Sequence, residues 1–195
     1  MYGKNSSGVG SPPLIDADRK LVTVISGGKY AEAAMAGRMF YSANSVMVLT
    51  STTLNTAFLG LGLCNPTGSG KNVIVHEFGW AMIVAAAAGL VLSLATTTDS
   101  GFANSATCPI VNCRNGYATS VCYTDEDATI VAPTIVKVVS QATTAATTTM
   151  QPRPQVLDLG GSIILAPGRA IVTDTTTAMA ADSVQFSFLW EEVDA

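Results

Sequence analysis

The chain has few charged residues. They make up 12% of its 195 residues, against roughly 25% in ordinary soluble domains, while hydrophobic residues make up 48%. Much of the surface must therefore be neutral, covered by Ser, Thr and Ala, and we expect part of it to be buried against other chains. The net charge of −4 and the lack of a basic stripe exclude nucleic acid as a main partner, since binding it requires Lys and Arg to neutralise phosphates.

The chain also lacks the residue groups on which catalysis and metal binding depend. No paired carboxylates or nucleophile motif are present, and the one histidine, His76, has no partner at motif spacing. We therefore predict no enzyme activity, no catalytic residue and no cofactor. Free thiols are expected in a chain of this size, although two of them could pair if oxidised, Cys108 and Cys113. Zinc is disfavoured because no C-x-x-C pair occurs among Cys64, Cys108, Cys113 and Cys122.

No apolar core follows the first lysine, Lys4, so a secretory signal peptide is not expected and synthesis in the cytosol is the default. Residues 1–18 are rich in Gly, Ser and Pro, which disfavour regular structure, and predict an extended arm. The arm is either a disordered tail or a segment that orders on a neighbouring subunit. In the second case Tyr2, Leu14 and Ile15 would be its contacts.

The segment Asn65–Asn72 resembles a phosphate-binding loop at first sight, because it contains Gly70-Lys71. The motif G-x-x-x-x-G-K-[ST] requires glycine where Asn65 stands and Ser or Thr where Asn72 stands. The next residues are β-branched and favour a strand, whereas a phosphate-binding loop opens a helix. We therefore predict a turn that joins two strands.

The segment Phe78–Ala95 has no charged residue, and its length approaches the ~20 residues of a membrane helix. Flanking charges that would orient such a helix are missing. We favour a buried β-hairpin with strands 73–84 and 90–94 and a turn near 86–89, with a membrane helix or a buried soluble helix as alternatives. In the first strand, His76 is expected to share an apolar face with Phe78 and Trp80.

The rest of the chain predicts a short helix and further strands. Ala, Glu and Met favour a helix within 30–37, and Asn115-Gly116 predicts a hairpin turn. The acidic run Asp125-Glu126-Asp127 is expected to be an exposed turn rather than a calcium site. Strands are predicted at 21–25, 38–41, 45–49, 59–64, 117–123, 130–139, 161–165, 170–172 and 183–190. Short strands separated by turns indicate an all-β protein, a jelly-roll-like β-sandwich over residues 19–195 that follows the arm 1–18.

Four stretches together resemble a known class of protein. They are K-L-V-T-V-I-S-G-G-K-Y-A-E-A-A-M-A-G-R-M-F, C-N-P-T-G-S-G-K-N-V-I-V, L-A-P-G-R-A and the terminal F-S-F-L-W-E-E. In this order the chain, from about Arg19 to Val193, is similar to small virion proteins of tailed bacteriophages. The likeness is to capsid decoration (cement) proteins with a jelly-roll fold.

This resemblance implies a homotrimer at local three-fold positions on the outer capsid surface of the virion, made in the host cytoplasm. Its partners would be the major capsid protein and itself, with no direct contact to nucleic acid or membrane. The resemblance provides no catalytic residue. The arm then becomes the candidate capsid contact, through Tyr2, Lys4, Leu14, Ile15 and Arg19.

A second class of function stays open. The same sandwich could be a head-fibre or receptor-binding module that recognises glycans on the host surface. Sugar recognition favours an exposed aromatic side chain, and the candidates are Trp80, Tyr117 and Tyr123.

Overall fold

The chain divides into two compact units, Met1–Glu32 and Ala33–Ala195. The computed structural model describes residues 3–4, 10–11, 28–45, 50, 60–82, 89–142, 155–176 and 184–195. In the first unit, β1 (Gly3–Lys4) pairs antiparallel with β2 (Gly10–Ser11). The predicted extended arm over residues 1–18 thus includes a pair of two-residue strands, and its extent stays a prediction. The predicted boundary between residues 18 and 19 lies outside the described residues.

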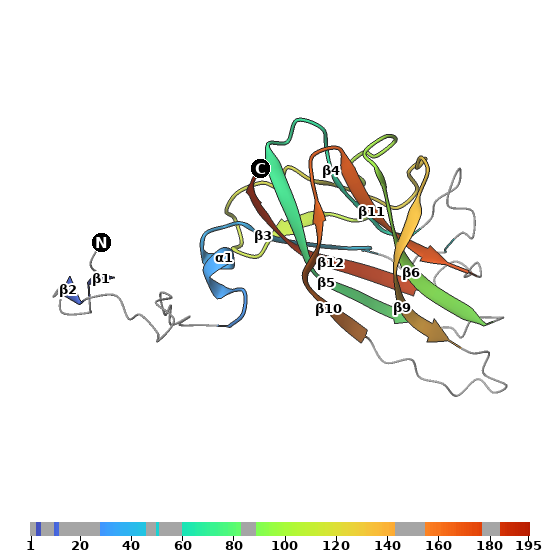
Figure 1. Ribbon diagram of the computed structural model, residues 1–195, viewed down its shortest axis with the longest axis horizontal. Helices are drawn as coiled ribbons and strands as arrows, with labels where there is room; N and C mark the ends of the chain where they lie inside the picture. Colours follow the sequence, from blue (N-terminus) through green and yellow to red (C-terminus); the bar gives the residue numbers. More distant parts are fainter. Residues whose placement is uncertain are drawn as a thin grey trace, which may run out of the picture. The chain divides into compact units, whose positions relative to one another are not determined.

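The described residues of the second unit form two five-stranded antiparallel sheets around a shared core (Figure 1). The first sheet has the order β10 (Gln155–Leu165), β5 (Lys71–Met82), β12 (Val184–Asp194), β3 (Met39–Ala43) and β7 (Ile110–Asn112). The second has the order β8 (Tyr123–Asp125), β4 (Gly62–Asn65), β11 (Arg169–Thr175), β6 (Leu90–Thr98) and β9 (Thr134–Ala142). The predicted all-β architecture is confirmed at this level.

One helix occurs among the described residues, α1 (Ala31–Met35), within the segment where the sequence predicts it. It ends at Gly37, whose φ of 75° is the left-handed conformation that glycine adopts readily after a helix. The Gly37 amide donates to the Ala34 carbonyl at 2.9 Å, so the last turn is closed by a backbone hydrogen bond. None of the described helical segments is long and apolar enough to cross a membrane.

Strand β12 provides the centre of the core. Its alternate residues Val184, Phe186, Phe188 and Trp190 are all buried, as the period-two pattern predicts. The Phe186 ring stacks on Phe78 of β5, with centroids 5.9 Å apart. This aromatic cluster holds the first sheet against the apolar side chains of the second, chiefly Leu61, Leu63, Leu92, Leu94 and Ile171.

Strands that follow each other along the chain mostly lie in different sheets. The strands predicted at 73–84 and 90–94 exist as β5 and β6, but β5 pairs with β10 and β12 whereas β6 pairs with β11 and β9. The predicted hairpin is therefore wrong. Consecutive strands cross from one sheet to the other, and each of them buries one face in the core that the two sheets share.

Two further turns also connect strands of opposite sheets. The 65–72 segment is a turn between strands, as predicted, but it leads from β4 in one sheet to β5 in the other. Asn115-Gly116 forms a turn with Gly116 at φ 75°, yet it connects β7 to β8 across the sandwich and not a hairpin. The expected strand 117–123 is reduced to its end, since β8 begins at Tyr123, and β7 forms where the sequence analysis predicted no strand.

A β-bulge in β5 changes which residues face the core. Pairing with β12 passes from Leu189↔Glu77 directly to Trp190↔Val75, so His76 is an extra residue. The predicted apolar face shared by His76 and Phe78 is therefore wrong. His76 lies instead beside Glu191, with 3.5 Å between its Nε2 and the Glu191 Oε2.

Loops cover part of the outer face of the second sheet. A small cluster forms where Phe102 packs with Ala95, Ala128, Ile130 and Val172. The expected strand at 130–139 begins only at Thr134, because Ala132 has a φ of 46° and Pro133 follows it. The expected strand at 21–25, and residues 46–49 of the strand expected at 45–49, lie outside the described residues.

Candidate functional site

The predicted capsid-contact residues are not brought together among the described residues. Lys4 lies in β1, opposite Gly10 of β2. The other four candidates, Tyr2, Leu14, Ile15 and Arg19, lie outside the described residues. The role of the arm therefore stays a prediction, and the described part of the chain has to be searched for other contact surfaces.

One edge strand of the second sheet, β9, exposes apolar side chains to solvent. Ile135 and Val136 are half exposed, and Val138 is 65% exposed. Lys137 lies among them, and its ammonium group has no hydrogen bond or ion pair within the described residues. A long edge strand with exposed β-branched residues favours association with another chain.

One edge strand of the first sheet, β10, is similarly apolar on its outer side. Val156 is 67% exposed and Ile164 is 59% exposed. Asp158 lies directly opposite Glu77 of β5, so two carboxylates are neighbours on the outer face. Like charges in directly opposite positions destabilise a sheet, and here the Gly160 amide donates a hydrogen bond to the Asp158 Oδ1 at 2.8 Å.

Next to this carboxylate pair, the outer face of the first sheet is hollowed. The register aligns Gly79 of β5 with Val156 and Ser187, and Ser187 with Ala43. These small side chains line a hollow of about 230 Å³, together with Ala81 and the flanking glutamines Gln155 and Gln185. A Cβ at Gly79 would lie 2.5 Å from the Ser187 Oγ, so only glycine fits here without a shift of its neighbour, and its missing side chain leaves the hollow open.

A second and larger cavity lies at the end of the sandwich near β7. Its volume is about 400 Å³, and Phe40 and Cys122 form part of its wall. Polar side chains from two loops complete it, with Asn104 and Ser105 from one loop and Thr119 from the other. The mixed lining suits a small polar ligand better than an apolar one.

The three aromatic candidates for sugar recognition have different surroundings. Trp80 is 7% exposed and belongs to the core, which removes it as a platform. Tyr123 is 37% exposed and Tyr117 is 53% exposed. The Arg114 guanidinium lies 4.3 Å from the Tyr117 ring centroid, and Gly37 packs against the same ring. Tyr117 is thus held in place beside the larger cavity, which it helps to line.

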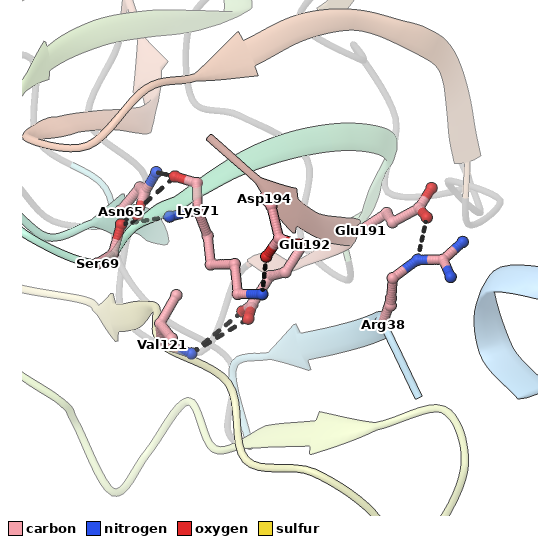
Figure 2. A network of polar contacts seen from close by, with 8 residues as sticks. All are labelled: Arg38, Asn65, Ser69, Lys71, Val121, Glu191, Glu192 and Asp194. Atoms are coloured by element: carbon pink, nitrogen blue, oxygen red, sulfur yellow. Dashed lines mark hydrogen bonds and ion pairs between the residues drawn. The ribbon is translucent and has the colours of Figure 1, made fainter. Parts of the chain in front are cut away.

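A buried carboxylate fixes the loop that forms one wall of this cavity. Glu192 of β12 accepts hydrogen bonds from the Ser120 Oγ at 2.5 Å and from the Val121 amide at 3.2 Å. It also accepts one from the Trp190 indole Nε1 at 3.3 Å. Figure 2 shows Glu192 directed at Val121. The strand predicted at 183–190 extends to Asp194, and this extension brings Glu192 into the sheet, where it is buried.

Surface ion pairs join the ends of β5 and β12 to their neighbours (Figure 2). The Lys71 Nζ lies 2.5 Å from the Asp194 Oδ1, and this hydrogen bond lowers the pKa of the Asp194 carboxyl. The Arg38 Nε donates to the Glu191 Oε1 at 2.8 Å. Lys71 therefore serves strand pairing, in agreement with the rejection of a phosphate-binding loop.

The acidic run at 125–127 is only partly the exposed turn that was expected. Asp125 is 5% exposed and accepts hydrogen bonds from the amides of Ala103, Glu126 and Asp127. The prediction is wrong for Asp125, because its carboxylate satisfies loop amides that would otherwise be buried without acceptors. Asp127 is exposed, and its hydrogen bond to Asp125 raises the pKa of its carboxyl. No cluster of three or more His, Cys, Asp or Glu residues suited to a metal ion occurs in the described ranges.

All four cysteines are free thiols. Cys64, Cys108 and Cys122 are buried, whereas Cys113 is exposed. Burial raises the pKa of the Cys64 thiol to about 12, and the nearby Asp99 carboxylate acts in the same direction. Burial also raises the pKa of Cys122 strongly, with a further contribution from Glu192. The buried thiols are thus packing residues and poor nucleophiles.

No protein-family model, curated protein or solved structure matches this chain. Its function therefore has to be inferred from its own surfaces. Of these, the exposed apolar edges and the hollow in the first sheet were not predicted from the sequence. The β-branched runs indicated strands, but only the strand order identifies β9 and β10 as edges.

Proposed function

We propose that this chain is a structural protein of a bacteriophage virion. In this proposal it is a capsid decoration protein that binds the outer surface of the shell as a homotrimer. The observation that carries the proposal is the exposure of β-branched side chains along one edge strand of each sheet, at Ile135, Val136 and Val138 on β9 and at Val156 and Ile164 on β10. Such edges need a partner chain to avoid uncontrolled association.

The activity in this proposal is mechanical. Each trimer joins neighbouring major-capsid subunits and stabilises the shell against the pressure of the packaged genome. Many copies contribute buried area and hydrogen bonds, and no turnover is needed. The low content of charged residues, 12%, favours surfaces that are buried between chains.

The finer fold in the proposal is a jelly roll. Its support is the path of the chain, which changes sheet at almost every step from β3 to β12, with β8 and β9 as the exception. Alternation between two facing sheets is expected when strands are joined by Greek-key connections instead of hairpins. The decoration proteins that this sequence resembles have the same architecture.

The N-terminal arm is assigned to the shell in this proposal. Lys4 and Arg19 would contact polar groups of the capsid, and Tyr2, Leu14 and Ile15 would contact apolar ones. Ordering of the arm reduces affinity through lost conformational entropy, but it extends the interface beyond the sandwich.

Co-sedimentation with capsids stripped of the protein tests the proposal. We expect the protein to pellet with such capsids at a fixed ratio to the major capsid protein, and to stay in the supernatant without them. Deletion of residues 1–18 should weaken binding without changing the melting temperature of the domain. An absence of co-sedimentation at saturating protein would contradict the proposal.

A second candidate function is glycan recognition by a head-fibre or receptor-binding module. It is favoured by the 400 Å³ cavity with polar walls beside the exposed Tyr117. Binding to host cells that is competed by free sugars and reduced by Tyr117→Ala would favour this function. Tyr123→Ala is the matched control, since this exposed tyrosine does not line the cavity.

A further inference from the structure

We propose that Asn115 is the site at which the folded chain undergoes spontaneous deamidation. Asn115-Gly116 is the one Asn-Gly pair of the sequence. Glycine hinders attack on the preceding side chain least, because it has no Cβ and its backbone adopts the widest range of conformations. The product is an aspartate or an isoaspartate at position 115. This inference goes beyond the proposed function and does not depend on it.

The reaction needs only these two neighbouring residues and water. The Gly116 backbone nitrogen attacks the Asn115 side-chain carbon Cγ and forms a new C–N bond. The Nδ2 group leaves as ammonia and takes the proton of the backbone nitrogen, which leaves a cyclic succinimide. Water then opens the ring, at the Cγ carbonyl to give aspartate or at the main-chain carbonyl to give isoaspartate. No atom is oxidised or reduced, and asparagine is among the thermally labile residues of proteins.

The turn leaves both reacting groups available. Asn115 and Gly116 are exposed, and the Tyr117 amide closes the turn around them by donating to the Arg114 carbonyl at 3.0 Å. Gly116 has a φ of 75°, and a Cβ built on it would meet nothing within 4 Å. Neither the Asn115 side chain nor the Gly116 amide has a hydrogen bond in the part of the chain that the structure describes. The nucleophile therefore breaks no existing bond when it attacks.

The other described asparagines differ in this respect, because the next backbone nitrogen is engaged or lacks a hydrogen. Asn104 is the closest comparison, since it is exposed in a loop as well. The amide of the residue after it, Ser105, donates to the Thr124 carbonyl at 2.9 Å. In the same way, the amide that follows Asn44 donates to the Thr107 carbonyl at 2.6 Å.

The remaining three asparagines of the described ranges are protected as well. The amide that follows Asn112 donates to the Met39 carbonyl at 2.9 Å. Asn65 is followed by a proline, which has no amide hydrogen. Asn72 is followed by a valine of β5 that has a strand neighbour on both sides, so its amide belongs to the sheet. The structure therefore selects Asn115 by the state of the attacking nitrogen as well as by the glycine.

The modification acts at the rim of the larger cavity. Gly116 and Tyr117 line this cavity of about 400 Å³, and the Arg114 guanidinium lies over the Tyr117 ring. Isoaspartate adds one carbon atom to the main chain inside the turn, so the bond between the Tyr117 amide and the Arg114 carbonyl can no longer close the same ring. Either product adds one negative charge to the net charge of −4.

Incubation of the native protein in mildly alkaline buffer at physiological temperature tests the inference. Isoelectric focusing should show an acidic species that accumulates with time and faster at higher pH, because the attacking nitrogen must lose its proton. Peptide mapping by tandem mass spectrometry should locate the change at position 115. Asn115→Gln, which keeps a neutral amide, should lose this species. Asn104→Gln is the matched control and should form it at the wild-type rate.

A synthetic peptide spanning residues 112–119 reports the reactivity of the same sequence outside the fold. A peptide that deamidates while the native protein forms no acidic species would overturn the inference, because the folded turn would then block the attack. Faster deamidation at any other asparagine of the native chain would overturn it as well. In denaturant Asn104 should react faster than in the native protein, since the Ser105 amide is released. Equal rates in the two states would contradict the protection on which the selection of Asn115 rests.

Discussion

The ring of Phe102 lies directly over the Cα atom of Gly62. A Cβ atom added at Gly62 would stand 2.5 Å from the Phe102 Cε1 atom and 3.2 Å from the Val172 Cγ1 atom. Gly62 belongs to β4, and Phe102 belongs to the loop that follows β6. This contact attaches the loop to the outer face of the second sheet, and the missing side chain of glycine allows the close approach.

Substitution of Gly62 by alanine should therefore destabilise the domain. The extra methyl group displaces Phe102 or strains β4, and overpacking of this kind costs about 1–3 kcal/mol. Urea unfolding followed by tryptophan fluorescence measures the loss. Gly89→Ala is the control, because a Cβ there meets nothing within 4 Å. Equal stability of the two variants would contradict the packing described for Phe102.

Removal of the buried Glu192 carboxylate should also destabilise the fold. Glu192→Ala leaves the Val121 amide and the Trp190 indole without their acceptor, and a loss of about 2–4 kcal/mol is expected. Glu192→Gln keeps one acceptor oxygen and should lose less. Hydrogen exchange should report the opening of the loop at Ser120 and Val121. Asp194→Asn, at an exposed position two residues further on, is expected to leave the unfolding midpoint nearly unchanged.

The parts of the fold that could be predicted from the sequence are those with an uninterrupted period. Val184, Phe186, Phe188 and Trp190 alternate without a break, and β12 places all four in the core. The same reasoning failed in β5, because the extra residue His76 shifts the alternation by one position. A bulge has no composition signal in that segment, so the sequence alone does not reveal it.

Strand pairing was harder to predict than strand location. The turns at Asn115-Gly116 and at 166–168 have the residues of hairpin turns, and both are turns in the structure. They nevertheless connect strands of opposite sheets, because burial in one shared core decides where the next strand goes. The hollow at Gly79 depends on neighbouring strands meeting in register, which no local pattern encodes.

The four thiols should react at very different rates. Cys113 is exposed, whereas the other three are buried, and burial raises the pKa of Cys64 to about 12. An aromatic disulfide reagent at pH 8 should therefore detect one fast thiol in the native protein and four in denaturant. Cys113→Ser should abolish the fast phase. A second fast thiol in that variant would show that the core near Cys64 or Cys122 is open to solvent.

The pH dependence of the free energy of unfolding should reveal the hydrogen bond between Asp99 and Thr67. The Thr67 amide donates to the Asp99 Oδ2 at 2.8 Å, and hydrogen bonds from Thr67 lower the pKa of this carboxyl. The ionised Asp99 carboxylate therefore stabilises the fold above the unfolded-state pKa of about 3.9. This stabilisation is lost as the pH falls through the pKa of Asp99 in the folded state, which is lower. Asp99→Asn should be less stable than the wild type at pH 7 by under about 1 kcal/mol, with the difference disappearing near pH 2.

Replacing Asp127 should change the stability at pH 7 in the opposite direction to replacing Asp99. Its hydrogen bond with Asp125 raises the pKa of its carboxyl, so its charged form is disfavoured in the folded state. Asp127→Asn should therefore raise stability at pH 7 and have little effect near pH 2. The same direction of change for both variants at pH 7 would contradict these assignments.

The most direct test of the proposed function is electron cryomicroscopy of stripped capsids with and without added protein. We expect a difference map with density on the outer surface at the local three-fold positions, large enough for three copies of the sandwich. Density that extends from each copy toward the major capsid protein would correspond to the arm. Capsids whose outer surface is unchanged by saturating protein would contradict a role in capsid decoration.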